Sequence, residues 1–361
     1  HDALPISEQR IGKGIRETFQ NTTNSVVSLW EGVEMLEFLL EKLERSVPRW
    51  IRNRLEEAKD VLECFCSSDE KYVRYLRLDT EQIPVLCAAS REIPGLLRKM
   101  LWDREEGVSA ILTSGTLKAG TGFLRTRQTT GLEERTGVQE YVAESPFSYE
   151  KNCLLYLPKT LEHCRRGSRE EAVMVANHIH SLICSTYGHT LVLFTSYTLM
   201  GSVYQILRDS LPFPMVEVWR HSQEEILRFK TMENAVLFAA GSCWEGVDFP
   251  GDMVSSLIIV KLPFAVPDPI SEAEKETYES LEDYIQAIIV PDMQKKLRQG
   301  FGRAIRTETD TCVVSILDFR AVKGGKYHED VMCALPPCPI AEELGEVQDF
   351  IRSRKGVEYY L

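Results

Sequence analysis

Seven short apolar segments, separated by stretches with helical periodicity, constrain the fold of this 361-residue chain more than any other feature. Strands that are apolar on both sides belong to parallel sheets, which helices cover on both faces. The segments are SAILTSGTL, NCLLYLP, TLVLFTS, MVEVW, AVLFAAGS, SSLIIVKLPF and TCVVSILDF. We predict helices between them at about 168–186, 197–209, 222–232, 271–288 and 291–304.

The first part of the chain follows a different pattern. Leu29, Leu36 and Leu40 belong to an apolar stripe that repeats every three or four residues until Pro48 interrupts it. The next stretch, RWIRNRLEEAKDVLECF, continues with the same period. Such stripes are typical of amphipathic helices, and a proline ends a helix because it lacks an N–H group. We therefore predict helices over about residues 24–102, packed against one another.

Bulk composition excludes several classes of protein. With 43% hydrophobic and 27% charged residues, the chain is typical of a globular protein. Its longest apolar runs are far shorter than the roughly 20 residues of a membrane-spanning helix, so we predict no membrane segment. The net charge of −12 argues against a protein that coats nucleic acid nonspecifically. The ten cysteines lack the C-x-x-C spacing of a zinc ribbon, which favours reduced packing residues, no metal site and a cytoplasmic location.

The first residues, HDALPIS, show neither a helix-capping pattern nor a periodic pattern of apolar residues. They match the translated end of a common sequencing adapter, so we expect residues 1–7 to be a non-native leader and exclude them from the fold. The alternative is that His1 ends a longer native motif.

The segment QKKLRQGFGRAIRTETD, residues 294–310, groups forked donors in an acidic chain. Gln299, Arg303 and Arg306 are three and four residues apart, beside two glycines. On an exposed helix they would be solvated charge. Aimed at one point, they would form a receptor for phosphate.

Polar residues and glycines directly follow several predicted strands. Ligands of open parallel sheets bind beyond the carboxyl ends of the strands, although strand-to-helix turns are also built from these residue types. All of them share one edge of the sheet, so we predict a site rather than a set of separate turns. They are Ser114, Gly115, Thr116, Ser196, Tyr197, Glu245, Gly246, Asp248 and Lys261.

Four motifs, ILTSGTL, TLVLFTSY, GSCWEGVDFPG and QGFGRAIR, resemble motifs III, IV, V and VI of the superfamily 2 DNA helicases of the DinG/XPD type, in the same order. The resemblance covers roughly residues 20–355. It implies an α/β fold with a RecA-like parallel sheet flanked by helices, preceded by an α-helical arch-like segment. The implied domains are the arch-like segment at 8–105, the last strand and motif III of a first RecA-like domain at 106–119, and a second RecA-like domain at 120–361.

The resemblance also implies roles in ATP hydrolysis. Arg303 and Arg306 would approach the terminal phosphates of ATP held by the first RecA-like domain, with Gln299 orienting the group. An arginine supplied in this way is worth on the order of 10³ to 10⁵ in phosphoryl-transfer rate. The other implied ATP-site residues are Gly115, Glu245, Gly246, Asp248 and Gly302.

Five residues are the implied contacts to single-stranded DNA: Ser114, Thr116, Ser196, Tyr197 and Trp244. Hydroxyl groups would contact phosphates, and an aromatic ring would stack on a base for roughly 1–3 kcal/mol. For Trp244 and Tyr197 a place in the core is an equally good alternative, since tryptophan is usually largely buried.

The chain departs from the family in several features. It has no Gly-rich P-loop with Lys and Ser/Thr and no acidic Mg²⁺ motif, and RIGKGIRE has the wrong spacing. ATP and Mg²⁺ are therefore expected cofactors of an intact protein, and we expect no ATPase activity from this chain alone. An iron–sulfur cluster would also lie outside it. Thr311 stands where a glycine is common after the motif VI aspartate.

The function implied for the intact protein is an ATP-dependent DNA helicase that translocates on single-stranded DNA, 5′ to 3′, in repair or replication. One alternative is a motor-less nucleic-acid-binding or adaptor module of the same fold, which would have no use for the arginines of QGFGRAIR. Another is an RNA helicase, which shares the chemistry but not the WEGVD detail.

Overall fold

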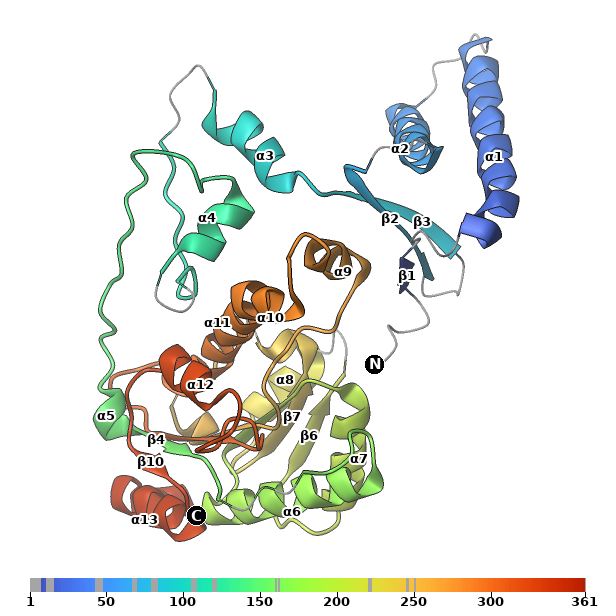
Figure 1. The fold of residues 1–361 in the computed structure, drawn as a ribbon. Coiled ribbons are helices and arrows are strands. Elements are labelled where there is room, and N and C mark those ends of the chain that lie inside the picture. Colours follow the sequence, from blue (N-terminus) through green and yellow to red (C-terminus); the bar gives the residue numbers. More distant parts are fainter. Residues whose placement is uncertain are drawn as a thin grey trace. The chain divides into compact units, whose positions relative to one another are not determined.

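The computed structural model describes residues 8–10, 16–42, 48–66, 70–78, 84–104, 109–118, 122–159, 161, 163–219, 223–244, 247–249 and 251–360 (Figure 1). These residues belong to two compact units that alternate along the sequence. The first unit contains the chain up to Ser109 together with Arg127–Arg135 and Val266–Ile285. The second contains Ala110–Thr126, Thr136–Ala265 and the chain from Gln286 onward.

A seven-stranded parallel sheet is the centre of the second unit. The strand order is β10-β4-β9-β8-β5-β7-β6, and every neighbouring pair is parallel. The strands are β4 (Cys153–Tyr156), β5 (Thr190–Phe194), β6 (Met215–Val218), β7 (Val236–Ala240), β8 (Ser256–Ile259), β9 (Cys312–Ile316) and β10 (Ile340–Ala341). Six of the seven predicted apolar segments thus form strands of one parallel sheet, and only the short β10 was not predicted.

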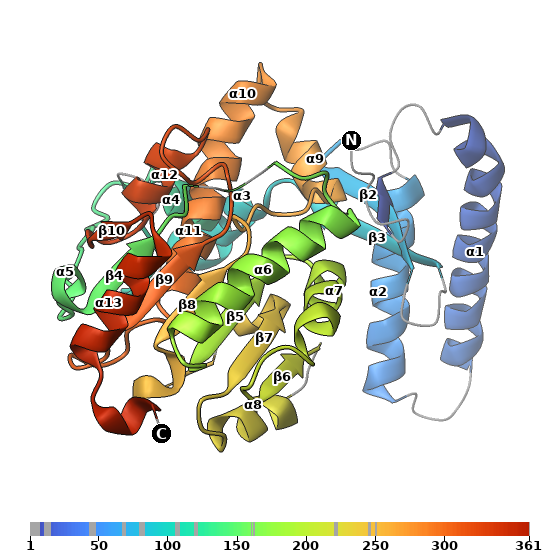
Figure 2. The same cartoon turned by 90° about the horizontal axis from the view of Figure 1, so that it is seen from below.

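Helices cover both faces of this sheet (Figure 2). Helices α6, α7 and α13 pack on one face, where Val192, Phe238 and Ile258 belong to one hydrophobic core cluster. Helix α11 packs on the other face, beside Leu193. The helices of this unit are α5 (Tyr149–Asn152), α6 (Arg169–Ser185), α7 (Tyr197–Leu207), α8 (Gln223–Lys230), η3 (Gly241–Trp244), η4 (Gly251–Val254), α11 (Val290–Phe301), α12 (His328–Ala334), α13 (Leu344–Arg354) and η6 (Val357–Tyr360).

The first unit combines the predicted helices with an antiparallel sheet of order β1-β2-β3. Helices α1 and α2 pack together, with Leu62 and Phe65 buried between α2 and its neighbours. The elements are β1 (Glu8–Arg10), α1 (Arg16–Lys42), α2 (Arg49–Cys66), β2 (Tyr72–Leu78), β3 (Pro84–Ser90), α3 (Ile93–Leu97), η2 (Arg98–Trp102), α9 (Pro269–Lys275) and α10 (Leu281–Tyr284). Two helices have residues in both units: α4 (Leu124–Thr130) and the π-helix η5 (Ile285–Ile289). None of the helices described is both long and apolar enough to cross a lipid bilayer.

Part of the all-helical prediction for residues 24–102 is wrong, because β2 and β3 form a hairpin-like pair within it. Strand β2 is YVRYLRL, rich in the aromatic and branched side chains that favour strands. It pairs with β3 along its full length, from Tyr72 opposite Ser90 to Leu78 opposite Pro84. The helical prediction overlooked this local preference, which pairing with β3 reinforces.

Two other predictions also differ from the structure. SAILTSGTL forms no strand, and Ile111 is 92% exposed. A strand needs a hydrogen-bonded neighbour, and no strand among the described residues pairs with this segment. The predicted helix at 271–288 is split, because Ser280 caps a new helix by accepting a hydrogen bond from the Asp283 N–H. Residues 266–285 pack in the first unit, where Arg91 donates to the carbonyl of Ala273.

Candidate functional site

The two arginines of the predicted phosphate receptor reach the segment after η3. Arg303 donates from Nη1 to the carbonyl of Val247 and from Nε to that of Trp244, the latter over 3.4 Å. Arg306 Nε lies 3.0 Å from Asp248 Oδ1, without the geometry of a hydrogen bond, and its Nη2 donates to Val247 over 3.5 Å. The structure therefore brings the QGFGRAIR motif to the GSCWEGVDFPG motif. The predicted residues Glu245 and Gly246 lie outside the described residues.

Gln299 extends this cluster to the segment before α4. Its Nε2 donates to Thr116 Oγ1 over 3.4 Å, across 183 residues of sequence. Thr116 is 8% exposed, and its backbone N–H donates to Ser114 Oγ over 3.3 Å. Gly115 between them is exposed, and a β-carbon there would meet nothing within 4 Å. Three predicted motifs thus meet at the end of α11.

Arg298, which the sequence interpretation did not select, anchors this arrangement. Its Nη1 donates to the carbonyl of Lys118 over 2.6 Å, and its Nε to that of Ala334 over 3.0 Å. Burial lowers the pKa of its guanidinium group below the usual value. Arg298 therefore ties residues 114–118 to α11. Its place beside Gln299 was visible in the sequence, but the direction of its side chain was not.

Asp310 holds the turn that presents Arg306. Its carboxylate is buried and accepts hydrogen bonds from the backbone N–H groups of Arg306 and Thr307, both over 2.8 Å. The Thr307 hydroxyl donates to the other carboxylate oxygen over 2.6 Å. The aspartate closes the turn by itself, so the turn forms with Thr311 in place of the common glycine.

Trp244 lies in the core, which decides between its two interpretations. It is 1% exposed, and its Nε1 donates to the carbonyl of Phe194 over 3.0 Å. A β-carbon on Gly300 would lie 2.8 Å from its ring, so Gly300 is required for this packing. The predicted stacking of Trp244 on a base is therefore not supported. Gly302 has ordinary helical angles, φ −61° and ψ −1°, which any residue adopts.

The predicted residues after β5 lie at the start of α7. Ser196 caps this helix, because its Oγ accepts from the Leu199 N–H over 3.3 Å. Tyr197 is half-buried and stacks on Trp219, with ring centroids 5.5 Å apart and planes 16° from parallel. Trp219 directly follows β6 and was not selected from the sequence. It is the last residue of the segment MVEVW, which was predicted as a strand, so it was not considered a site residue.

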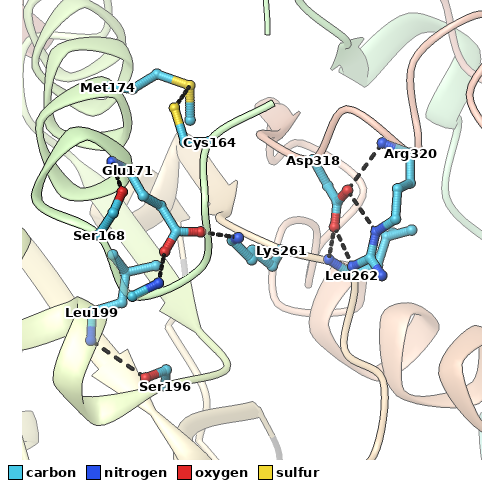
Figure 3. Close-up of polar contacts among 11 residues, drawn as sticks. Cys164, Ser168, Glu171, Met174, Ser196, Leu199, Lys261, Leu262, Asp318 and Arg320 are labelled. Atoms are coloured by element: carbon cyan, nitrogen blue, oxygen red, sulfur yellow. Dashed lines mark hydrogen bonds and ion pairs between the residues drawn. The ribbon is translucent and has the colours of Figure 1, made fainter. Parts of the chain in front are cut away.

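Two ion pairs, each with a buried carboxylate and a partly exposed cation, lie beyond the carboxyl ends of β8 and β9 (Figure 3). Lys261 pairs with Glu171 of α6, whose side chain is 2% exposed. Asp318 receives two hydrogen bonds from the Arg320 guanidinium, over 3.0 and 2.7 Å, and a third from the Leu262 N–H over 2.9 Å. Burial by itself raises the pKa of Asp318, but Arg320 and the backbone N–H groups hold it below its usual value. These pairs fix the loops that follow both strands.

The arrangement as a whole offers cationic donors in a cluster rather than metal ligands. Gln299, Arg303 and Arg306 come from one short segment, and Asp248 partly neutralises Arg306. The Asp248 side chain is 66% exposed, so this ion pair is mostly solvated and adds little stability. Within the described ranges, no group of three or more His, Cys, Asp or Glu side chains is placed to hold a metal ion.

Comparisons with known proteins identify the domain to which these residues belong. Residues 179–338 match the family model of a helicase C-terminal domain. The chain is 27% identical over 336 residues to a protein of Bacillus subtilis named 3′-5′ exonuclease DinG, covering 88% of this chain and 35% of that protein. It is 33% identical over 270 residues to an ATP-dependent DNA helicase DinG of Photobacterium profundum, covering 72% of this chain and 38% of that protein.

Solved structures show the same fold. An apo XPD structure superimposes with a TM-score of 0.52 at 18% identity, covering 81% of this chain and 59% of that one. The fold comparison and the two DinG proteins confirm the RecA-like sheet that the motifs predicted. The chain spans little more than a third of the length of those two relatives. It belongs to the DinG/XPD-type superfamily 2 helicases, in the region that contains their helicase C-terminal domain.

Proposed function

We propose that this chain supplies the second motor domain of an ATP-dependent DNA helicase. The observation that carries the proposal is the cluster of Gln299, Arg303 and Arg306, held against Asp248 and Thr116. The names of relatives from Photobacterium profundum and Escherichia coli, both ATP-dependent DNA helicases, support it. The Bacillus subtilis relative is named an exonuclease, so relatives' names alone do not decide the activity.

The cluster fits a triphosphate by charge and shape. Guanidinium groups are planar, permanently charged and matched to phosphate oxygens. Arg303 and Arg306 would stabilise charge that develops on the terminal phosphate, and Gln299 would orient it. The ATP itself supplies the bond that is broken. The backbone carbonyls of Trp244 and Val247 fix the Arg303 guanidinium before ATP arrives, so little side-chain entropy is lost on binding.

The nucleotide would be shared with a first RecA-like domain, because the 361 residues contain no P-loop sequence. Gly115, Glu245, Gly246, Asp248 and Gly302 remain proposed members of the same ATP site. The described residues provide no cluster that fits Mg²⁺, so we derive no metal-dependent step from them.

Single-stranded DNA is the proposed track. Ser114 is exposed beside the ATP cluster, and Ser196 and Tyr197 lie at the start of α7. Hydroxyl groups and helix N-termini are common phosphate contacts. Thr116 is mostly buried and bonded to Gln299. It therefore fits a relay between the ATP cluster and Ser114 better than a direct DNA contact.

The ATPase of the full-length gene product tests the proposal. Arg303→Ala should lower DNA-stimulated kcat by on the order of 10³-fold or more, because the charge on the transferred phosphoryl group loses its partner. Affinity for single-stranded DNA should stay unchanged. Arg352→Ala, which removes an exposed arginine of α13, is the matched control and should keep full activity.

A motor-less module gives a different result in the same assay. It would bind nucleic acid while the wild-type full-length product showed no DNA-stimulated phosphate release. Strand separation on DNA but not RNA duplexes would in turn separate a DNA from an RNA helicase. We also expect no steady phosphate release from the 361-residue chain by itself.

A further inference from the structure

Trp219 presents an aromatic face at the carboxyl edge of the sheet. It follows β6 directly and is 48% exposed. One face of its indole ring stacks on Tyr197, with planes 16° from parallel. The far edge of the ring lies against α7, where a β-carbon on Gly201 would be 3.6 Å from it. Tyr197 therefore covers one ring face and α7 one edge, while 48% of the residue remains exposed.

Tyr197 lies behind this ring and contacts the end of a neighbouring strand. Its hydroxyl group donates to the carbonyl of Ala240, at the end of β7, over 3.5 Å. Gly241 follows with φ +64°, and a β-carbon there would lie 2.6 Å from the Tyr197 oxygen. Both the positive φ and this close approach require glycine. Gly241 also begins the η3 segment that leads to the carbonyls contacted by Arg303.

We propose that Trp219 is a base-stacking platform for single-stranded DNA and that Tyr197 is its positioning residue. This inference rests on the proposed function, and it assigns to Trp219 the stacking role that burial denies to Trp244. The exposed part of Trp219 leaves its indole ring accessible to a planar ligand. Every base has a π-face, so a fixed ring binds nucleic acid without regard to sequence. The stacked Tyr197 removes the rotamer freedom that binding would otherwise cost.

Packing against α7 alone is the competing explanation. It would use the covered face and edge of the ring, and a leucine would serve as well. It does not account for a second aromatic ring stacked behind the first, with its hydroxyl group fixed at the end of a neighbouring strand.

Equilibrium binding of the 361-residue chain to fluorescein-labelled oligothymidylate tests the proposal. Trp219→Ala should weaken binding by about 5- to 150-fold, the equivalent of one stacked base. Trp219→Phe should restore most of the affinity. An abasic oligonucleotide of equal length should bind the wild type and Trp219→Ala equally, because it has no base to stack. The slope of log Kd against log salt should not change, since no phosphate contact is removed.

Three results separate the possible failures. If wild type binds oligothymidylate and Trp219→Ala binds it equally well, the stacking proposal is wrong while the proposed function stands. If the variant loses equal affinity for the abasic strand, its effect is structural and the proposal is also wrong. If wild type binds no single-stranded DNA, the stacking proposal is wrong, and the proposed function is decided separately by the ATPase of the full-length product. Trp50→Ala removes another exposed tryptophan, 69% exposed, and should leave binding unchanged. Unchanged thermal unfolding of each variant shows that it is folded.

Discussion

The contact between Gly300 and Trp244 gives a prediction whose size follows from the structure. A β-carbon on Gly300 would lie 2.8 and 2.9 Å from two carbons of the Trp244 ring and 3.4 Å from Leu193 Cδ1. Carbon atoms pack best at about 3.5–4.0 Å, so the ring must move by a substantial fraction of an ångström. It is 1% exposed and held by its hydrogen bond to Phe194, so it has little room to move.

Gly300→Ala should therefore destabilise the protein despite a better helix propensity. Overpacking a core costs about 1–3 kcal/mol, and this site belongs at the upper end because the neighbour is a fixed ring. Replacing glycine by alanine within a helix stabilises the helix by about 1 kcal/mol, because alanine has the higher helix propensity. The net loss in the free energy of unfolding is about 1–2 kcal/mol, or roughly 2–8 °C in Tm for a domain of this size.

Urea and thermal unfolding of the variant measure this loss. Gly345→Ala is the matched control, since Gly345 lies in α13 and a β-carbon there meets nothing within 4 Å. It should be neutral or stabilising by up to about 1 kcal/mol. The double variant Gly300→Ala with Trp244→Phe should lose less free energy of unfolding than the two single variants lose together, because the smaller ring relieves the clash. A Gly300→Ala protein as stable as the wild type would refute the packing argument.

Asp318, which is buried, and His189, which is partly buried, make the stability of the protein depend on pH. Asp318→Asn should cost about 1–3 kcal/mol near neutral pH, because Arg320, whose side chain is 32% exposed, loses its paired carboxylate. The native pKa of Asp318 is lowered, so its contribution holds above about pH 4 and is lost as pH falls further. Urea unfolding at about pH 3 should show a smaller difference between variant and wild type, and an equal difference there would contradict this assignment. Burial lowers the pKa of His189, whose ring nitrogens face the carbonyls of Asp252 and Tyr359. The unfolded chain therefore takes up a proton first as pH falls below about 6.5, and stability falls with it. His189→Asn should flatten the decrease of Tm between about pH 7 and 5, and an unchanged slope would show that another group titrates there.

Most of the parallel sheet was predictable because its signal is local. Segments such as TLVLF and VLFAA are apolar at every position, and all five residues of β5 and of β7 are buried. Serines placed just before α6 and α7 also mark where those helices begin. The strands at 72–90 were missed because the helical prediction overlooked the strand preference of YVRYLRL, which pairing with β3 reinforces.

The site was only partly predictable. The spacing of Gln299, Arg303 and Arg306 indicated a shared target, and the structure gathers them at one end of α11. Nothing in the spacing showed that Arg298 anchors Lys118, or that Glu171 pairs with Lys261. Those pairs join residues 180 and 90 positions apart, and no local pattern encodes such distances.

The sequence by itself determined the chemistry available here: apolar strands that must be covered on both faces, and guanidinium groups at a spacing suited to phosphate. The tertiary structure alone decided which aromatic ring faces water. Trp244 and Trp219 each lie shortly after a strand. Trp244 is buried beneath α11, whereas Trp219 stacks on Tyr197 and is 48% exposed. The difference depends on what packs against each ring. Gly300 leaves room for Trp244 in the core, whereas Tyr197 and α7 cover one face and one edge of Trp219 and 48% of that residue stays exposed.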